Sequence, residues 1–110
     1  MAEHEDDIRQ AIVIILGTNP GERVMRLGFG AGLHAFVFEP LNTGTLALIR
    51  TRVEQSLIDW EPRIDLVDVA VSADSPEMNR VLIEVDYRVR ATNSLHNLVY
   101  PFYLQEGAAA

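Results

Sequence analysis

The stretch "RVLIEVDYRVR", Arg80 to Arg90, decides the fold because apolar residues recur at every second position along it. Residues two apart share one face of a strand, so this face would be apolar while Glu84 and Asp86 lie on the other face. The apolar set is Val81, Ile83, Val85, Tyr87 and Val89. This pattern predicts an antiparallel strand with one face on a core and the other in water.

A second strand is expected upstream, in "RIDLVDVAVSA", Arg63 to Ala73. Its apolar residues change phase, because Ile64 and Leu66 fall on one face whereas Val67, Val69 and Val71 fall on the other. Such a slip indicates a β-bulge near Leu66 and Val67. The short connection "SADSPEMN" then predicts that the two strands pair in antiparallel fashion.

A third strand is expected downstream, in "HNLVYPFYL", His96 to Leu104. Its inward face would carry Leu98, Tyr100, Phe102 and Leu104. Val99 and Pro101 would share the outward face. Proline cannot donate a backbone hydrogen bond, so Pro101 indicates a strand at the edge of the sheet.

Two helices are expected before these strands. Apolar residues three and four apart run from Ile8 to Leu16, after the helix-starting acids Asp6 and Asp7 and before Gly17. A longer helix is predicted from Thr45 to about Asp59, with apolar residues at Leu46, Ile49, Val53, Leu57 and Trp60. The order predicts an α+β fold, in which N-terminal helices, one of them long and central, pack on a three-stranded, mainly antiparallel β-meander.

Length and composition limit what such a fold could do. The 110 residues predict one domain at 7–105, with flexible tails at 1–6 and 106–110. A net charge of −7 without any Lys argues against nucleic-acid binding. The longest apolar run, "AIVIIL", has six residues and follows the acidic "EHEDD", which predicts neither a membrane span nor a signal peptide. We therefore expect a soluble protein that is not exported by a signal peptide.

No cofactor or metal site is predicted. The chain has no Cys, and His4, His34 and His96 do not share a metal-ligand spacing. The glycine-rich stretch from Gly28 to Gly32 lacks both the dinucleotide fingerprint and the Lys of a P-loop, so close backbone packing is the favoured interpretation.

Glu84 and Asp86 are the one pair of acids that could serve a glycoside hydrolase. They would point to the same strand face, and alternate strand residues lie roughly 6.7 Å apart, within the range of catalytic carboxylate pairs. Arg88 and Arg90 continue the same face, however, and a solvated strand face gives the same spacing. No catalytic residue is assigned from this pattern.

The stretch "WEPRI", Trp60 to Ile64, lies where the long helix meets the first strand. Trp60 would anchor the helix end in the core, and Pro62 would force the chain out of the helix. Glu61 and Arg63 would then project to the same side of an exposed corner. Two interpretations stay open on these residues, a local salt bridge of small stabilising effect and a docking point.

The chain resembles the phage baseplate wedge proteins historically called tail lysozymes, relatives of the type VI secretion baseplate component. The resemblance rests on "ILGTNPGERVMRLGFGAGL", "WEPRI", "VDYRVRATN" and "NLVYPFYL", and it extends from Ile8 to Leu104. It implies that Glu61, Pro62 and Arg63 dock the protein among other baseplate wedge proteins. It also implies that the β-meander offers a template for the contractile sheath subunit.

These implications define the function expected from the sequence. The protein would be a structural component that oligomerises within a larger assembly, located in a tail baseplate or in the bacterial cytoplasm before assembly. Val99 and Pro101, on the expected edge strand, would take part in adding a sheath strand. The alternatives are a peptidoglycan-degrading tail lysozyme and a small regulatory adaptor on the same fold.

Overall fold

The computed structural model describes residues 2–19, 30–75 and 79–104, with side chains at 5–19, 30–73 and 79–104. Helix α1 spans Ala2–Gly17, a short 3₁₀ helix η1 spans Leu33–Phe36, and helix α2 spans Thr43–Trp60. Three strands follow, β1 at Ile64–Ser75, β2 at Arg80–Val89 and β3 at Ser94–Tyr103. The expected 106–110 tail lies outside the described residues.

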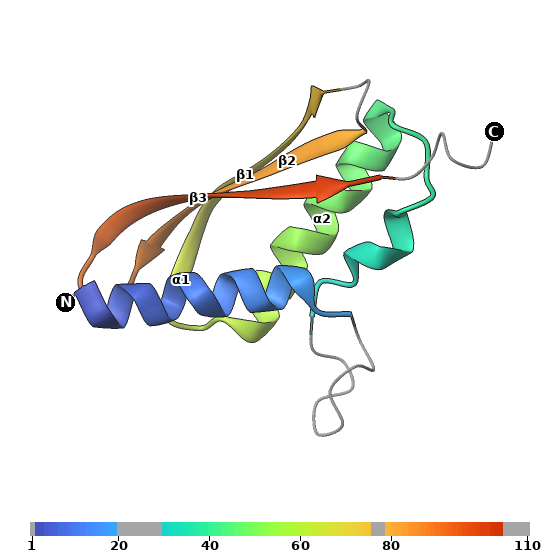
Figure 1. Cartoon of the computed structure of the whole chain (residues 1–110). Coiled ribbons are helices and arrows are strands. Elements are labelled where there is room, and N and C mark those ends of the chain that lie inside the picture. The colour runs from blue at the N-terminus through green and yellow to red at the C-terminus, as the bar shows by residue number, and fades with distance from the viewer. Residues whose placement is uncertain (1, 20–29, 76–78, 105–110) are drawn as a thin grey trace.

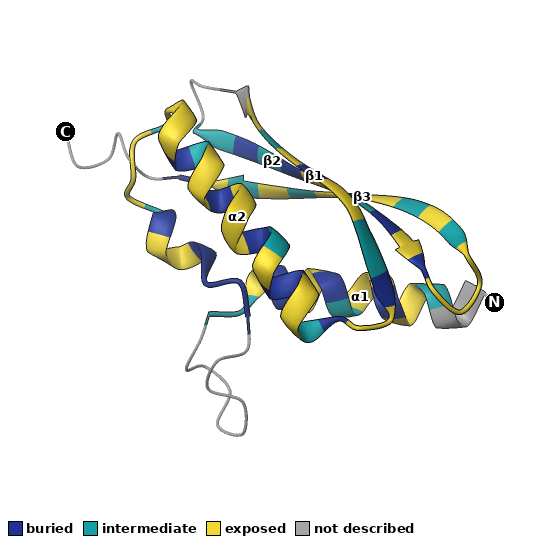
Figure 2. Ribbon diagram, turned by 180° about the vertical axis from the view of Figure 1, so that it is seen from behind, coloured by how far each residue is buried: buried dark blue, intermediate teal, exposed yellow. Residues whose placement is uncertain are grey.

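The two long helices pack on one face of an antiparallel sheet with the strand order β1-β2-β3 (Figure 1). Figure 2 shows α2 lying along this face, with buried residues on the side that it turns toward the strands. Apolar residues from both helices and all three strands join one core cluster. The α+β fold expected from the sequence is confirmed.

Helix α1 forms because its apolar residues recur on one side, where Ile8, Ile12, Ile15 and Leu16 are buried. It begins at Ala2, earlier than the acids Asp6 and Asp7 suggested, so residues 2–6 continue the helix instead of forming a separate tail.

Contacts with β3 explain why the first turns of α1 are held. The Glu5 carboxylate accepts a hydrogen bond from Ser94 Oγ (2.9 Å) and lies 3.4 Å from His96 Nε2. The Ser94 hydrogen bond, followed by attraction to His96, lowers the pKa of Glu5 below its ordinary value. The start of α1 is therefore tied to the start of β3.

The chain returns from α1 through a segment in which Gly30 has a structural role. Its φ is +112°, and a Cβ atom there would lie 2.3 Å from the carbonyl oxygen of Thr18. The neighbouring Ala31 N–H donates to the carbonyl of Ile15 (2.9 Å). Close backbone packing is thus confirmed at Gly30, whereas Gly28 lies outside the described residues.

Helix α2 starts at a side-chain cap, because Asn42 Oδ1 accepts a hydrogen bond from the Thr45 N–H (2.9 Å). Ile49, Val53 and Leu57 are buried against the sheet, as their spacing predicts. Trp60, at the end of the helix, is partly buried against the core. Among the described residues, no helix is long and apolar enough to span a membrane.

The predicted β-bulge in β1 is confirmed, since the pairing with β2 shifts between Leu66 and Asp68. The shift leaves Val67 outside the ladder with 59% of its surface exposed, although its phase grouped it with the inward Val69. The bulge brings Ile64, before it, and Val69, after it, onto the same core face.

Strands β2 and β3 follow the predicted alternation. All five apolar residues assigned to the inward face of β2 are at most 1% exposed. On β3, Leu98 is buried, while Tyr100 and Phe102 pack against the core from partly buried positions. The opposite face of the sheet is not covered by the two helices.

Candidate functional site

The corner between α2 and β1 carries the Glu-Pro-Arg residues singled out in the sequence. Glu61 ends α2 as its C-cap residue, and its N–H donates to the carbonyl of Leu57 (3.0 Å). Its φ of −129° and ψ of 80° already lie outside the helical region, as expected for a residue before proline. Arg63 then joins the start of the sheet, because its carbonyl accepts a hydrogen bond from the Arg90 N–H (3.0 Å).

Glu61 is buried rather than exposed, which corrects the expectation for this residue. Only 3% of its surface is accessible, and Arg63 binds its carboxylate at both oxygens. Arg63 Nε lies 2.8 Å from Oε1 and Nη2 lies 2.8 Å from Oε2, while the Arg63 N–H also donates to Oε1 (3.2 Å). This bidentate pairing satisfies the carboxylate and so permits its burial.

The surface of the corner is formed by Pro62 and Arg63. The Arg63 side chain is 42% exposed, and Pro62 is also exposed. The hydrogen bonds to Glu61 raise the pKa of Arg63, because they favour its charged form. Nε and Nη2 are used in the pair, whereas Nη1 takes no part in it. The corner therefore presents a fixed cation beside a rigid proline.

A hollow of about 330 Å³ adjoins the corner and is lined in part by Glu61, Pro62 and Ile58. Ile58 is an apolar residue with 63% of its surface exposed. Asp65 and Arg90 line the same hollow, with Arg90 Nε 2.8 Å from Asp65 Oδ1. Ile58, Asp65 and Arg90 were not predicted as site residues from the sequence, although the four-residue spacing from Ile58 to Pro62 could have indicated Ile58.

Asp65 is held by two arginines from β2 and the turn after it. Hydrogen bonds from Arg88, first, and from Arg90 lower the pKa of Asp65 below its ordinary value. Arg88 Nη1 also donates to Asn93 Oδ1 (3.0 Å), in the turn between β2 and β3. The charged groups around the hollow are thus fixed relative to one another.

The second group of sequence-predicted residues lies on β3, which is an edge strand of the sheet. The Leu104 N–H donates to the carbonyl of Asn79 (2.8 Å), and this bond continues the register of β2 with β3. Even-numbered residues of β3 therefore direct their backbone groups toward β2. Val99 and Pro101 direct theirs toward the open edge, so Pro101 removes no bond from the ladder.

The side chains of Val99 and Pro101 lie on the sheet face that the helices leave uncovered. Val99 is 46% exposed, and Tyr103, farther along the same strand, is 50% exposed. Earlier on the strand, Arg9 of α1 donates from Nη1 to the Asn97 carbonyl (3.4 Å). The stretch from Val99 to Tyr103 is therefore the more open part of this edge.

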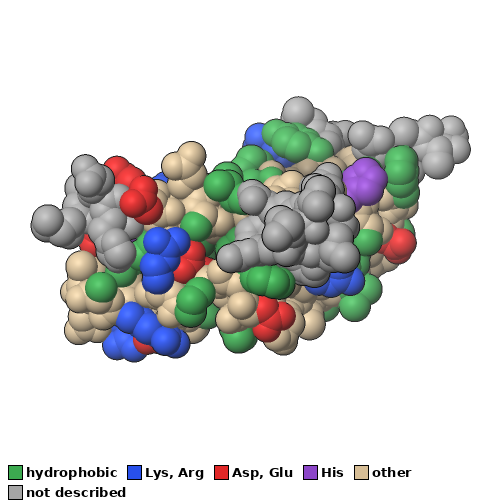
Figure 3. All heavy atoms as spheres, turned by 90° about the horizontal axis from the view of Figure 1, so that it is seen from below, with side chains coloured by type: hydrophobic (Ala, Val, Ile, Leu, Met, Phe, Trp, Pro, Cys, Tyr) green, Lys and Arg blue, Asp and Glu red, His purple; other side chains and the backbone are tan. Residues whose placement is uncertain are grey.

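The structure does not bring the Glu-Pro-Arg residues and the β3 edge into one site. Residues 61–63 lie at the start of β1, and β1 and β3 are on opposite sides of β2. Figure 3 shows one face of the molecule on which arginine side chains lie beside acidic ones with apolar side chains between them. The Glu-Pro-Arg residues and the β3 edge are therefore two separate surfaces of the molecule.

Glu84 and Asp86 lie on the outer sheet face, as predicted. Asn97 Nδ2 donates to Glu84 Oε2 (3.1 Å) and to Asp86 Oδ1 (2.6 Å), so one neutral amide bridges the two acids. In the part of the chain that the structure describes, no three His, Cys, Asp or Glu residues are placed to hold a metal ion.

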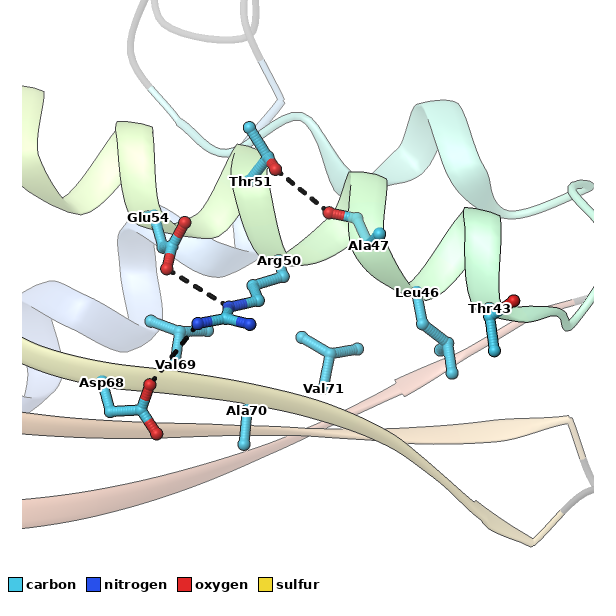
Figure 4. Close-up of a pocket in the computed structure, with 10 residues that line it drawn as sticks. All are labelled: Thr43, Leu46, Ala47, Arg50, Thr51, Glu54, Asp68, Val69, Ala70 and Val71. Carbon is cyan, nitrogen blue, oxygen red and sulfur yellow. Dashed lines mark hydrogen bonds and ion pairs between the residues drawn. The ribbon is translucent and has the colours of Figure 1, made fainter.

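A groove that the sequence analysis did not predict runs between α2 and β1, and we call it the α2–β1 groove (Figure 4). Its volume is about 720 Å³. Arg50 reaches across it from α2, with Nε 3.3 Å from Glu54 Oε2 and Nη2 3.6 Å from Asp68 Oδ1. The four-residue spacing of Arg50 and Glu54 was visible in the sequence, but the contact with β1 was not.

Comparison with known proteins gives a family match over most of the chain. The family model described as baseplate wedge protein gp25 matches residues 2–94. None of the curated proteins compared with the chain matches it in sequence.

Solved structures give three further likenesses. A protein of Geobacter sulfurreducens provisionally named a tail lysozyme is 54% identical, with 92% of this chain and 91% of that chain covered and a TM-score of 0.85. A chain of the anti-feeding prophage baseplate is 32% identical, with a TM-score of 0.60. That match covers 89% of this chain and 66% of the baseplate chain. A chain of the type VI secretion baseplate complex shares the fold, with a TM-score of 0.74 and 19% sequence identity. The match covers 96% of this chain and 99% of that chain.

Proposed function

This chain belongs to the baseplate wedge protein gp25 family, and we propose that it docks into a baseplate through the Glu-Pro-Arg corner and starts a contractile sheath at the β3 edge. The family gives the chain a structural role in the baseplate of a contractile injection system. Related chains are parts of multi-subunit baseplates, so the partners include other baseplate proteins.

The observation that carries the docking proposal is the buried pairing of Glu61 with Arg63. Glu61 binds Nε and Nη2 and so fixes the direction of the guanidinium, while Nη1 is left to a partner. A fixed guanidinium loses little conformational freedom on binding and suits a carboxylate or carbonyl group. The adjacent hollow, with exposed Ile58 on its wall, would take an apolar side chain of the same partner.

The sheath proposal rests on the open part of β3. Between Val99 and Tyr103, alternate residues direct backbone groups away from β2, and an added strand could bond to them. In this mode the affinity comes from the main chain. Pro101 can offer only its carbonyl to an added strand, so Val99 and Tyr103 supply the N–H donors, and a further proline at either position would remove one of them.

The docking test removes the charged pair as a unit. Replacing Arg63 alone would leave a buried carboxylate without its partner, whereas an apolar replacement of a buried pair is often neutral for stability. We expect the double variant Glu61→Leu/Arg63→Ala to fold but not to enter baseplates, measured by circular dichroism and by its content in purified particles. Arg52→Ala is the matched control, because Arg52 is an exposed arginine of α2 that lines neither the hollow at the corner nor the α2–β1 groove.

Two outcomes decide this test. Normal incorporation of the folded double variant would refute docking through the corner. Loss of incorporation by the Arg52→Ala control as well would show that the effect is not specific to Arg63.

Peptidoglycan hydrolysis is the alternative function, favoured by the provisional name of the Geobacter sulfurreducens relative. Glu84 and Asp86 share one amide donor, Asn97 Nδ2, on the sheet face that the two helices leave uncovered. A hollow of about 360 Å³ on this face is lined by Asp86 and Asn97 but not by Glu84, so the two acids do not face one enclosed site as a glycosidase pair would. We therefore propose that the protein does not cleave cell-wall polymer. Turnover of purified peptidoglycan that disappears in Glu84→Gln would contradict this proposal.

A further inference from the structure

We propose that the α2–β1 groove binds a basic, extended segment of a partner protein by strand addition to β1. This surface is distinct from the corner and from the β3 edge, since β1 and β3 form opposite edges of the sheet. The proposal therefore adds a third contact to those of the proposed function. It rests on the backbone of β1, the shape of the groove and its charges.

The free edge of β1 offers backbone groups for a new strand. Odd-numbered residues of β2 bond to β3, so its even-numbered residues, Glu84 and Leu82, bond to their partners Ala70 and Ser72 on β1. Val69 and Val71 lie between these bonded positions. Their N–H and carbonyl groups consequently point away from β2, toward the groove.

The groove has the length and direction of a short strand. In Figure 4 the residues of α2 from Thr43 to Glu54 run opposite in order to those of β1 from Asp68 to Val71. One helical step of four residues advances about 6 Å, and two residues of a strand advance about 6.7 Å. Successive inward side chains of an added strand would thus meet Leu46, Arg50 and Glu54 in turn.

The side chains of the groove define the chemistry of the segment. Near Leu46 and Val71 the walls are apolar, so a segment residue there would be apolar. At the other end, Glu54 and Asp68 place two carboxylates around the single guanidinium of Arg50. The side chains of Glu54 and Asp68 are 36% and 55% exposed, so both carboxylates are accessible to a Lys or Arg of the segment.

The test uses two nine-residue peptides that alternate valine and threonine and differ only in two inward positions, which carry lysine in one peptide and glutamate in the other. Amide hydrogen exchange of the full chain is followed by NMR. We expect the lysine peptide to slow exchange at Val69 and Val71 by about tenfold, and the glutamate peptide to have little effect.

Substitutions of the charged groove residues test whether the lysine peptide binds at the two carboxylates. Arg50 competes with the peptide for the two carboxylates, so Arg50→Gln should tighten binding of the lysine peptide by about threefold, the effect of an exposed ion pair. Glu54→Gln/Asp68→Asn should weaken it. No slowing at Val69 and Val71, slowing at Val99 instead, or weaker binding in Arg50→Gln would each overturn the proposal.

Discussion

At the scale of the residue, the pairing of Glu61 with Arg63 changes what the corner means. The two side chains do not both face a partner, because Glu61 is buried and Arg63 covers it. Glu61 is thus a positioning residue, and Arg63 with Pro62 forms the proposed contact. Because Glu61 is buried and Arg63 covers it, the two side chains contribute differently to the stability of the fold.

Single substitutions should reveal this difference. Arg63→Ala leaves a carboxylate that is 3% exposed without its cation, and we expect a loss of about 3–5 kcal/mol in the free energy of unfolding. Glu61→Ala leaves a guanidinium that water can reach, so its cost should be smaller, about 1–3 kcal/mol. Urea denaturation of both variants measures the order, and an equal or reversed order would contradict the asymmetric burial.

The sequence predicted the residues of the corner but not their burial. The sequence Glu-Pro-Arg is the same whether the two charged side chains form a buried pair or an exposed one. The burial arises only once α2 and β1 have packed, when Glu61 lies with the buried Leu57 and Ile64 along one hollow. The exposed Ile58 was missed for the same reason, because the helical pattern does not show which apolar residues stay outside the core.

At the scale of the element, β3 is the strand whose backbone leads most directly to a functional prediction. Its register with β2 directs the backbone groups of Val99 toward the open edge. The alternation of apolar residues and the position of Pro101 were sufficient to predict this strand and its edge position. The bulge in β1 was also predictable from the sequence. The exposed position of Val67 was not, because the apolar pattern does not show which residue is left out of the pairing with β2.

Substitution of Val99 separates the edge from the fold. Val99→Pro removes an N–H that bonds to no strand of this sheet, so we expect the domain to stay folded while sheath initiation is blocked. Val99→Thr keeps the N–H and is the matched control, with sheath expected to form normally. Circular dichroism checks the fold and electron microscopy counts sheathed particles; a folded Val99→Pro protein that still starts sheath would exclude this edge as the template.

At the scale of the whole molecule, the fold separates its surfaces. One sheet face is covered by two helices, and this arrangement leaves the corner, the β3 edge and the α2–β1 groove at different places on the surface. A protein with separate contacts suits an assembly in which several neighbours meet. The fold class followed from the sequence because periodicity reports burial, whereas the groove arises between elements far apart in the chain and has no local pattern.

The most direct measurement is a cryo-electron microscopy structure of the assembled particle that contains this chain. The proposed function predicts that Pro62 and Arg63 contact a neighbouring baseplate protein, with Arg63 Nη1 bound to a carboxylate or carbonyl. It also predicts a sheath strand paired along Val99 to Tyr103. A particle in which the corner faces solvent and the β3 edge is unpaired would contradict the account.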